Sequence, residues 1–325
     1  MTPLDVRLLR ALRETCVHLP AGDLAAQLGE SAATVRARIA ALTAAGFEIE
    51  DRPGFGFRLT SAPDRLIADD LTARLGPCML IREILVFAET DSTNDLATQL
   101  GRQCARGGLA IFAEHQTAGR GRFGRRWASA SHRGLWFSLL LRPALPVAQW
   151  ARLTTWAAVS IAAAIEETLG AKAAIKWPND VFLAGKKVAG ILAESGTDAQ
   201  GNAFAVVGIG VNVNHETGDF PPDLQTTAGS LRENIGTTID RTALATAILR
   251  ALDARLPLLS EDFGSLIAEA SARSFLLRRW IQVRAGETLA EGLAESLDEN
   301  GHLLLRLADG TLDTLSVGEV TVIAR

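Results

Sequence analysis

The sequence lacks any apolar run that could cross a membrane, and it is poor in cysteine and histidine. No run reaches the roughly 18 apolar residues that a membrane span requires. Three cysteines and five histidines lie scattered through 325 residues without metal-ligand spacing, which argues against a disulfide framework and a structural metal site. The amphipathic N-terminus has neither the apolar core nor the cleavage site of a signal peptide, so we expect a cytoplasmic protein without a membrane partner.

An excess of positive charge is also missing. The formal net charge of −4 at pH 7 argues against a protein whose whole surface binds nucleic acid, although it permits a local basic patch. Hydrophobic residues make up 48% of the chain, which is ample for burial, and 325 residues are too many for one compact core. We therefore expect two or three domains.

One stretch is strongly basic. The nine residues from Gly119 to Trp127 include three glycines and four arginines, and no lysine or acidic residue occurs between Gly119 and Arg133. Closely spaced glycines disfavour helix and strand, which predicts a loop. Guanidinium groups and accessible backbone N–H groups bind phosphate and carboxylate. The loop is therefore either a nucleic-acid patch or a clamp that closes over a phosphorylated or adenylated small molecule.

The first unit, residues 1–63, predicts a winged helix-turn-helix. Apolar residues at helical spacing indicate three helices, and a two-stranded hairpin follows them. Arg36 and Arg38 fall in the third helix, and Arg52 and Arg58 fall in the hairpin, where all four are candidate DNA contacts. However, the unit carries seven arginines and seven acidic residues, so its phosphate affinity is weak unless the arginines share one face. The alternative is a helical domain used only for packing or dimerisation.

Residues 64–274 predict a mixed sheet with covering helices. A strand at 84–87 leads into Ser92 and Thr93, whose hydroxyl groups either cap the next helix or bind a polar ligand. A strand at 109–113 leads through Gln116 into the basic loop, and a strand at 135–141 follows it. The polar run from Lys176 to Asp180 lies at a strand end, as either an edge turn or a functional site.

Residues 275–325 read as alternating strands separated by Asn-Gly and Asp-Gly turns, which predicts a small SH3-like β-barrel. The whole chain is thus expected to be an α+β protein: a winged helix-turn-helix, a central mixed-sheet domain with helices, and a C-terminal barrel.

Four motifs together resemble the signature of the biotin protein ligases. They are Gln116 through Trp127, Lys176 through Asp180, Lys187 through Glu194, and Gly208 through Asn214, with Asp91 through Asn94 fitting as well. Each motif alone is weak, but their order and spacing make the set specific. With the N-terminal winged helix, the chain is similar over essentially its full length to the bifunctional kind, which biotinylates carrier proteins and represses biotin synthesis genes.

The resemblance implies a two-step reaction. ATP and biotin, with Mg²⁺, give biotinyl-5′-AMP and pyrophosphate, and biotin then passes to a lysine of a biotin carboxyl carrier protein. The residues that match catalytic positions of the family are Lys187, Arg120, Arg122 and Asp180. Those that match biotin-binding positions are Ser92, Thr93, Gln116, Gly119, Arg120, Arg122, Lys187, Gly208 and Gly210. Those that match nucleotide-binding positions are Arg122, Trp127, Asn179, Lys187 and Asn212.

Several role assignments follow from this resemblance. Lys187 is expected to meet the biotin carboxylate and the α-phosphate, with Lys186 as a rival one residue away. Asp180 is expected to hold the attacking ammonium or accept its proton. Gly208 and Gly210 would let biotin's bicyclic ring lie against the backbone. The adenine contacts within residues 215–231 stay open, because this region is longer than in the family.

Three functional interpretations differ in what the winged helix and the site do. The first is a biotin ligase that also binds operator DNA as a repressor, with a homodimer as the binding form. The second is a ligase whose winged helix no longer represses. The third is a regulator that senses biotin or its adenylate without transferring it. A lipoate ligase is disfavoured because the basic loop and Lys-Trp-Pro-Asn-Asp belong to the biotin branch.

Overall fold

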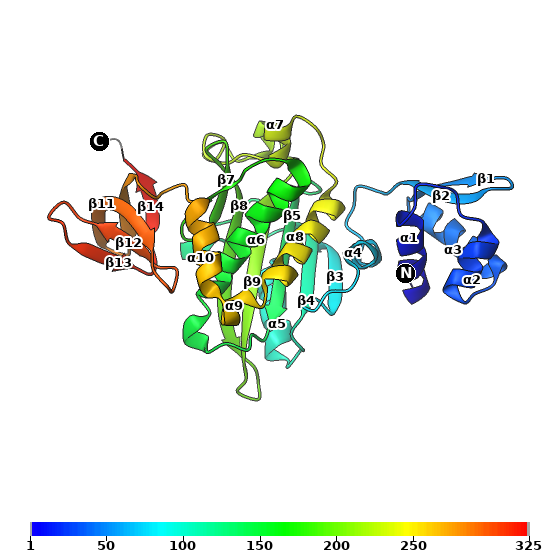
Figure 1. Ribbon diagram of the computed structural model, residues 1–325, viewed down its shortest axis with the longest axis horizontal. Coiled ribbons are helices and arrows are strands. Elements are labelled where there is room, and N and C mark those ends of the chain that lie inside the picture. The colour runs from blue at the N-terminus through cyan, green and yellow to red at the C-terminus, as the bar shows by residue number, and fades with distance from the viewer. Residues whose placement is uncertain (1, 324–325) are drawn as a thin grey trace.

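Three separate sheets organise the chain in the computed structural model, which describes residues 2–323 (Figure 1). A two-stranded sheet lies near the N-terminus, a seven-stranded sheet in the centre and a five-stranded sheet near the C-terminus. The expected α+β architecture is confirmed. Within residues 2–323, no helix combines the length and hydropathy needed to cross a membrane.

The N-terminal helices and hairpin form the predicted winged helix-turn-helix. Its elements are α1 (Pro3–Arg13), α2 (Ala21–Leu28), α3 (Ala32–Ala44), β1 (Glu48–Arg52) and β2 (Gly56–Ser61). Gly29 ends α2 with a φ of 67°, which a side chain would strain, and Ser31 caps α3 by accepting a 3.0 Å hydrogen bond from the Thr34 amide. Leu8, Leu24 and Val35 are fully buried where the three helices meet.

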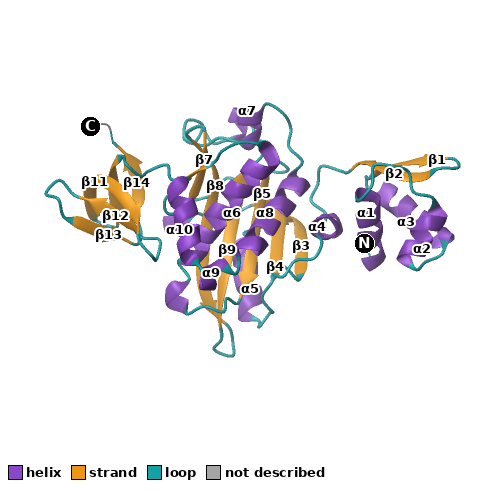
Figure 2. Cartoon of the chain, viewed as in Figure 1, coloured by secondary structure: helices purple, strands orange, loops and turns teal. Residues whose placement is uncertain are grey.

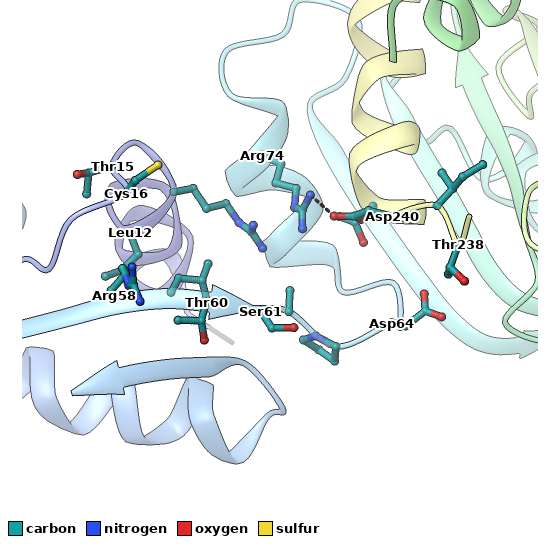
Figure 3. A pocket seen from close by; sticks show the side chains of 16 residues that line it. Leu12, Thr15, Cys16, Arg58, Thr60, Ser61, Asp64, Arg74, Thr238 and Asp240 are labelled. Atoms are coloured by element: carbon teal, nitrogen blue, oxygen red, sulfur yellow. Dashed lines mark hydrogen bonds and ion pairs between the residues drawn. The ribbon is translucent and has the colours of Figure 1, made fainter. Parts of the chain in front are cut away.

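Helix α4 (Ala68–Leu75) is shared between the N-terminal and central cores. Ala73 packs into the N-terminal core, whereas Leu71 and Leu75 belong to the central one. Figure 1 shows α4 between the two bodies, and Figure 3 shows the adjoining pocket, where Arg74 forms a 2.8 Å ion pair with Asp240. A boundary near residue 63 remains our proposal, and α4 follows it and packs on both cores.

The central sheet has the strand order β3-β4-β5-β9-β8-β7-β6. Its strands are β3 (Glu83–Thr90), β4 (Leu109–Gln116), β5 (Gly134–Leu141), β6 (Ala174–Lys176), β7 (Asp180–Leu183), β8 (Lys186–Thr197) and β9 (Ala203–Asn212). The pairing of β3 with β4 is parallel and the other pairings are antiparallel, so the predicted mixed sheet is confirmed. Residues 177–179 form the turn of the β6–β7 hairpin at the sheet edge.

The helices divide the two faces of this sheet unequally (Figures 1 and 2). Those that complete the central domain are α5 (Thr93–Arg102), α6 (Arg152–Leu169), α7 (Leu231–Ile235), α8 (Arg241–Arg255), α9 (Leu258–Glu261) and α10 (Phe263–Ala272). Val207 and Ile209 of β9 lie in the large core with α6 and α8, whereas Phe204 and Val206 lie in the smaller core with α5. Since α5 begins at Thr93, the second face is left without a helical cover beyond that point.

The C-terminal unit is an antiparallel sheet in the order β13-β12-β11-β10-β14. Its strands are β10 (Trp280–Ala285), β11 (Thr288–Leu297), β12 (Leu303–Arg306), β13 (Leu312–Leu315) and β14 (Glu319–Val322). The sequence of β13 shows no apolar alternation that would predict a strand, since three of its four residues are exposed. Among the described residues β13 and β14 do not pair, so the sheet is present but the barrel is not closed by hydrogen bonds.

A buried arginine ties the chain before α4 to the central sheet. The Arg241 guanidinium donates to Glu114 Oε2 at 2.7 Å and to the Asp64 carbonyl at 2.7 Å. Glu114 Oε1 also accepts from the Leu66 amide at 2.6 Å. The side chains of Arg241 and Glu114 are only 1% and 6% exposed. Charges this buried are tolerated because each has its partner.

Arg241→Met is expected to lower the free energy of unfolding by about 3–5 kcal/mol, because it leaves the buried Glu114 carboxylate without its guanidinium partner. Urea denaturation measures the effect. Arg232→Met is the control: Arg232 pairs with the exposed Glu216, so its loss is expected to change stability by less than about 1 kcal/mol. Equal losses in the two variants would contradict the role given to Arg241.

Candidate active site

A pocket lies on the uncovered part of the second face, beside the N-terminus of α5. Most of the predicted site residues line it: Ser92, Thr93, Gln116, Arg120, Arg122, Trp127, Asn179, Lys187, Gly208 and Gly210. Gly119 and Asp180 contact this set, since the Trp127 amide donates to the Gly119 carbonyl at 2.8 Å and Asp180 pairs with Lys187. Asn212 does not line the pocket. The structure thus brings together residues from β4, α5, the basic loop, the β6–β7 turn, β8 and β9.

One end of the pocket is a hydrogen-bonded cluster of side chains. Ser92 caps α5, and Gln116 Oε1 accepts from the Thr93 amide at 2.8 Å and from its hydroxyl at 3.2 Å. Ser138 on β5 donates to Thr93 Oγ1 at 2.7 Å, or to Asn94 Oδ1 at 2.6 Å. Ser92 and Thr93 are therefore both helix-start residues and pocket residues. Asn94 belongs to the stretch from Asp91 to Asn94 that fits the family motifs, whereas Ser138 is not among the predicted site residues, because a lone serine carries no distinctive pattern.

Glycines let two side chains approach the sheet closely. A Cβ at Gly208 would lie 2.1 Å from Asn94 Oδ1, and a Cβ at Gly210 would lie 2.6 Å from the Trp127 ring. Gly190 gives the same ring room from β8, where a Cβ would lie 2.7 Å away. We expected biotin's ring to use the space over Gly208 and Gly210, but in the structure Asn94 and Trp127 fill that space.

The basic loop is fastened by ion pairs and hydrogen bonds at three points. Arg120 forms a bidentate pair with Glu194 of β8 at 3.0 and 2.7 Å. Arg122 donates to Asn179 Oδ1 at 3.0 Å, and Arg125 pairs with Glu319 of the C-terminal sheet at 2.5 Å. These contacts hold the loop across the pocket mouth.

Burial acts differently on the two pocket arginines. It would lower the pKa of Arg120, but the Glu194 and Asp95 carboxylates outweigh it and raise that pKa. It does lower the pKa of Arg122, which has only Asp180 and Glu319 nearby as compensating charges. Arg122 is therefore the less compensated cation, and it is the better placed of the two to gain from an anionic ligand.

A β-bulge decides which lysine faces the pocket. Gly190 pairs with Asp180, and regular alternation along β8 would put Val188 and Lys186 on the same face as Gly190. The register shifts between Val181 and Phe182, however, which turns Lys187 to that face instead. Lys187 Nζ lies 2.7 Å from Asp180 Oδ1 and 5.2 Å from the Trp127 ring centroid. Lys186 Nζ instead points to the Gln225 carbonyl, at 3.5 Å.

The segment after β9 runs beside Lys187. The Lys187 amide donates to the Thr227 carbonyl at 2.9 Å, and the Gly229 amide donates to the Lys187 carbonyl at 3.0 Å. Asn212 is 4% exposed and donates to the Gly229 carbonyl at 3.0 Å. Asn212 thus positions the segment that contains Ala228 and Gly229, and its contact with a nucleotide remains a prediction.

The four arginines predicted to meet DNA differ in their partners. Arg38 pairs with the fully buried Asp5 at 2.5 Å, and Arg58 pairs with Glu50 at 2.7 Å. Arg36 and Arg52 are exposed and, in the described part of the chain, lie over aromatic rings rather than carboxylates. The charge free to meet phosphate is therefore carried mainly by Arg36 in α3 and Arg52 in the hairpin.

Comparison with known proteins agrees with this geometry. The model of the biotin/lipoate A/B protein ligase family matches residues 86–214, and an HTH domain model matches residues 7–58. The chain is 32% identical over 284 residues to the bifunctional ligase/repressor BirA of Bacillus subtilis, covering 87% of each chain. It is 28% identical over 302 residues to the bifunctional ligase/repressor BirA of Escherichia coli, covering 92% of this chain and 91% of that one.

A solved structure is similar as well. The biotin protein ligase from Aquifex aeolicus in complex with biotin and ATP matches with a TM-score of 0.65 and 28% identity, over 75% of this chain and 100% of that one. The shared fold is that of the biotin protein ligases. The chain belongs to the biotin/lipoate A/B protein ligase family, among the bifunctional biotin ligases that carry an N-terminal helix-turn-helix domain.

Proposed function

We propose that this protein is an ATP-dependent biotin protein ligase that also acts as a biotin-responsive repressor. The observation that carries the ligase function is the gathering of Lys187, Arg120, Arg122 and Gln116 around one pocket beneath the basic loop. A carboxylate and a triphosphate repel each other, so joining them requires fixed cations at the reacting atoms. The pocket supplies such cations at one end and neutral hydrogen-bonding groups at the other.

The two ends suggest how biotin is oriented. Ser92, Thr93 and Gln116 offer hydroxyl and amide groups for the ureido ring, and Lys187 offers its ammonium group to the carboxylate and the α-phosphate. Arg122, held by Asn179, is placed for the nucleotide. The product is a mixed anhydride that water would hydrolyse, so a loop fastened across the mouth protects it until transfer.

Transfer requires the carrier lysine to lose a proton before it attacks. Asp180 lies beside Lys187 at the outer side of the pocket, where its carboxylate can hold the incoming ammonium or accept its proton. We propose a biotin carboxyl carrier protein as the acceptor. Its lysine would enter past Asp180 and Asn179, since the other side of the pocket is closed by α5.

Mg²⁺ is proposed to arrive with ATP. In proteins Mg²⁺ is usually held by one or two carboxylates together with substrate phosphates and water. Asp180 could supply such a carboxylate. Within the described residues, no group of three or more His, Cys, Asp or Glu side chains is placed to hold a metal ion by itself. The ion would neutralise phosphate charge, while orientation of the substrates falls to the side chains named above.

Biotin-dependent exchange of pyrophosphate into ATP is the test of the ligase function. Lys187→Ala is expected to lower the exchange rate by about 100-fold, because it removes the cation nearest the reacting groups. Lys186→Ala is the matched control and is expected to keep exchange near the wild-type rate, since Lys186 turns away to Gln225. Exchange that depends on lipoate, or bound biotin without any exchange, would contradict the proposal and favour a lipoate ligase or a sensor, respectively.

The repressor function predicts sequence-selective DNA binding by α3 and the hairpin. A duplex selected from a randomised pool by the biotin- and ATP-loaded protein serves as the probe, and dimer formation is followed in parallel by sedimentation. Arg36→Ala and Arg52→Ala are each expected to weaken binding and to reduce the salt slope by about one. Arg38→Ala is expected mainly to destabilise the domain, because it leaves Asp5 buried and unpaired. Failure to select any sequence would leave a ligase with a non-repressing winged helix.

A further inference from the structure

A lateral row of paired residues crosses the sheet beneath the pocket and ends at Lys176. Trp136 of β5 pairs with Gly210, Gly210 with Gly190, Gly190 with Asp180, and Asp180 with Lys176. Residues that pair directly in an antiparallel ladder project their side chains from the same face. The Lys176 side chain therefore stands on the pocket face, on the edge strand of the sheet.

The order of strands along this row places the site residues one after another across the sheet. Thr93 and Gln116 lie at the β4–β5 side of the pocket, and Lys187 lies near Gly190 on β8. Neighbouring strands are about 4.8 Å apart, which puts Lys176 on β6 roughly 10 Å further along than β8. A nucleotide whose α-phosphate meets Lys187 thus has Lys176 beyond it, on the side away from biotin's ring.

Lys176 is a half-buried cation with no salt bridge in the described part of the chain. Its ammonium nitrogen lies 5.4 Å from the Phe182 ring centroid, which is a weak substitute for an anion. Burial lowers the pKa of Lys176, and the nearby charges include Lys187 and Arg125 as well as Asp180. Its ammonium group would therefore gain from an anion at this corner of the site.

The part of the site around Lys176 and Arg122 carries surplus positive charge. The charges that act on Lys176 and Arg122 come from both the sheet and the C-terminal unit. The cations are Lys176, Lys187, Arg122 and Arg125, and the carboxylates are Asp180 and Glu319. Four positive groups against two negative ones suit a ligand with several negative charges, such as a polyphosphate.

We propose that Lys176 holds the β- and γ-phosphates of ATP and then the departing pyrophosphate, an inference that rests on the ligase function proposed above. In adenylation, a biotin carboxylate oxygen forms a bond to the α-phosphorus while the bond from that phosphorus to the α–β bridging oxygen breaks. The electron pair leaves with pyrophosphate, so negative charge grows on the leaving group. A cation fixed at that position stabilises the charge where it develops.

The test is direct binding of inorganic pyrophosphate with Mg²⁺ to the full chain, measured by calorimetry. Lys176→Met is expected to weaken pyrophosphate binding at least tenfold and to raise the KM for ATP, with biotin affinity unchanged. Lys176→Arg is expected to restore most of the binding, because it keeps the charge. Lys172→Met is the matched control, since Lys172 is an exposed lysine four residues earlier that lies outside β6 and its ladder of paired residues.

Equal pyrophosphate affinity in wild type and Lys176→Met would overturn the proposal. If that variant also loses transfer from supplied biotinyl-5′-AMP to hydroxylamine with a shifted pH profile, Lys176 is a proton acceptor instead. Failure of the ligase function would be seen separately, because wild type would then show no biotin-dependent exchange of pyrophosphate into ATP. The pyrophosphate-binding measurement would still decide whether Lys176 forms a pyrophosphate subsite.

Discussion

Close contact between Trp127 and the sheet is the constraint on which the site depends. The indole can reach the backbone because Gly190 and Gly210 have no side chains to hold it off. The seated ring fixes the C-terminal end of the basic loop. Arg120 and Arg122, a few residues earlier, then lie within reach of Glu194 and Asn179. A larger residue on either strand would lift the ring, and the cations would lose their common orientation.

The unequal covering of the sheet explains why the site lies where it does. Helices α6 and α8 bury one face, and α5 buries part of the other with Phe204 and Val206. The remaining part is closed by the basic loop, whose arginines are held by ion pairs and hydrogen bonds and whose Trp127 packs on Gly190 and Gly210. A loop held in this way can open without unfolding the domain. Arg241 fixes β4 at Glu114, two residues before Gln116, so movement near Gln116 takes place against a rigid support.

Much of the architecture and of the site could be predicted because it rests on local patterns and on a motif set. The winged helix, the basic loop and the pocket residues all follow from such signals. The choice of Lys187 over Lys186 was favoured by the motif resemblance but could not be predicted from alternation, since it depends on a bulge. Nor could the pairing of Arg38 with Asp5, which are 33 residues apart, or strand β13, whose residues are mostly exposed. Nonlocal pairing and burial decide these features.

The loss of bound biotinyl-5′-AMP from Gly210→Ala tests the central claim most directly. A Cβ at this position meets the Trp127 ring, so the loop should seal poorly, and we predict hydrolysis or release at least tenfold faster (~1.4 kcal/mol) than in wild type. Gly218→Ala, where a Cβ meets nothing within 4 Å, is expected to keep the wild-type rate. An unchanged rate in folded Gly210→Ala would contradict the account, because it would show that Trp127 need not contact the sheet for the adenylate to be protected.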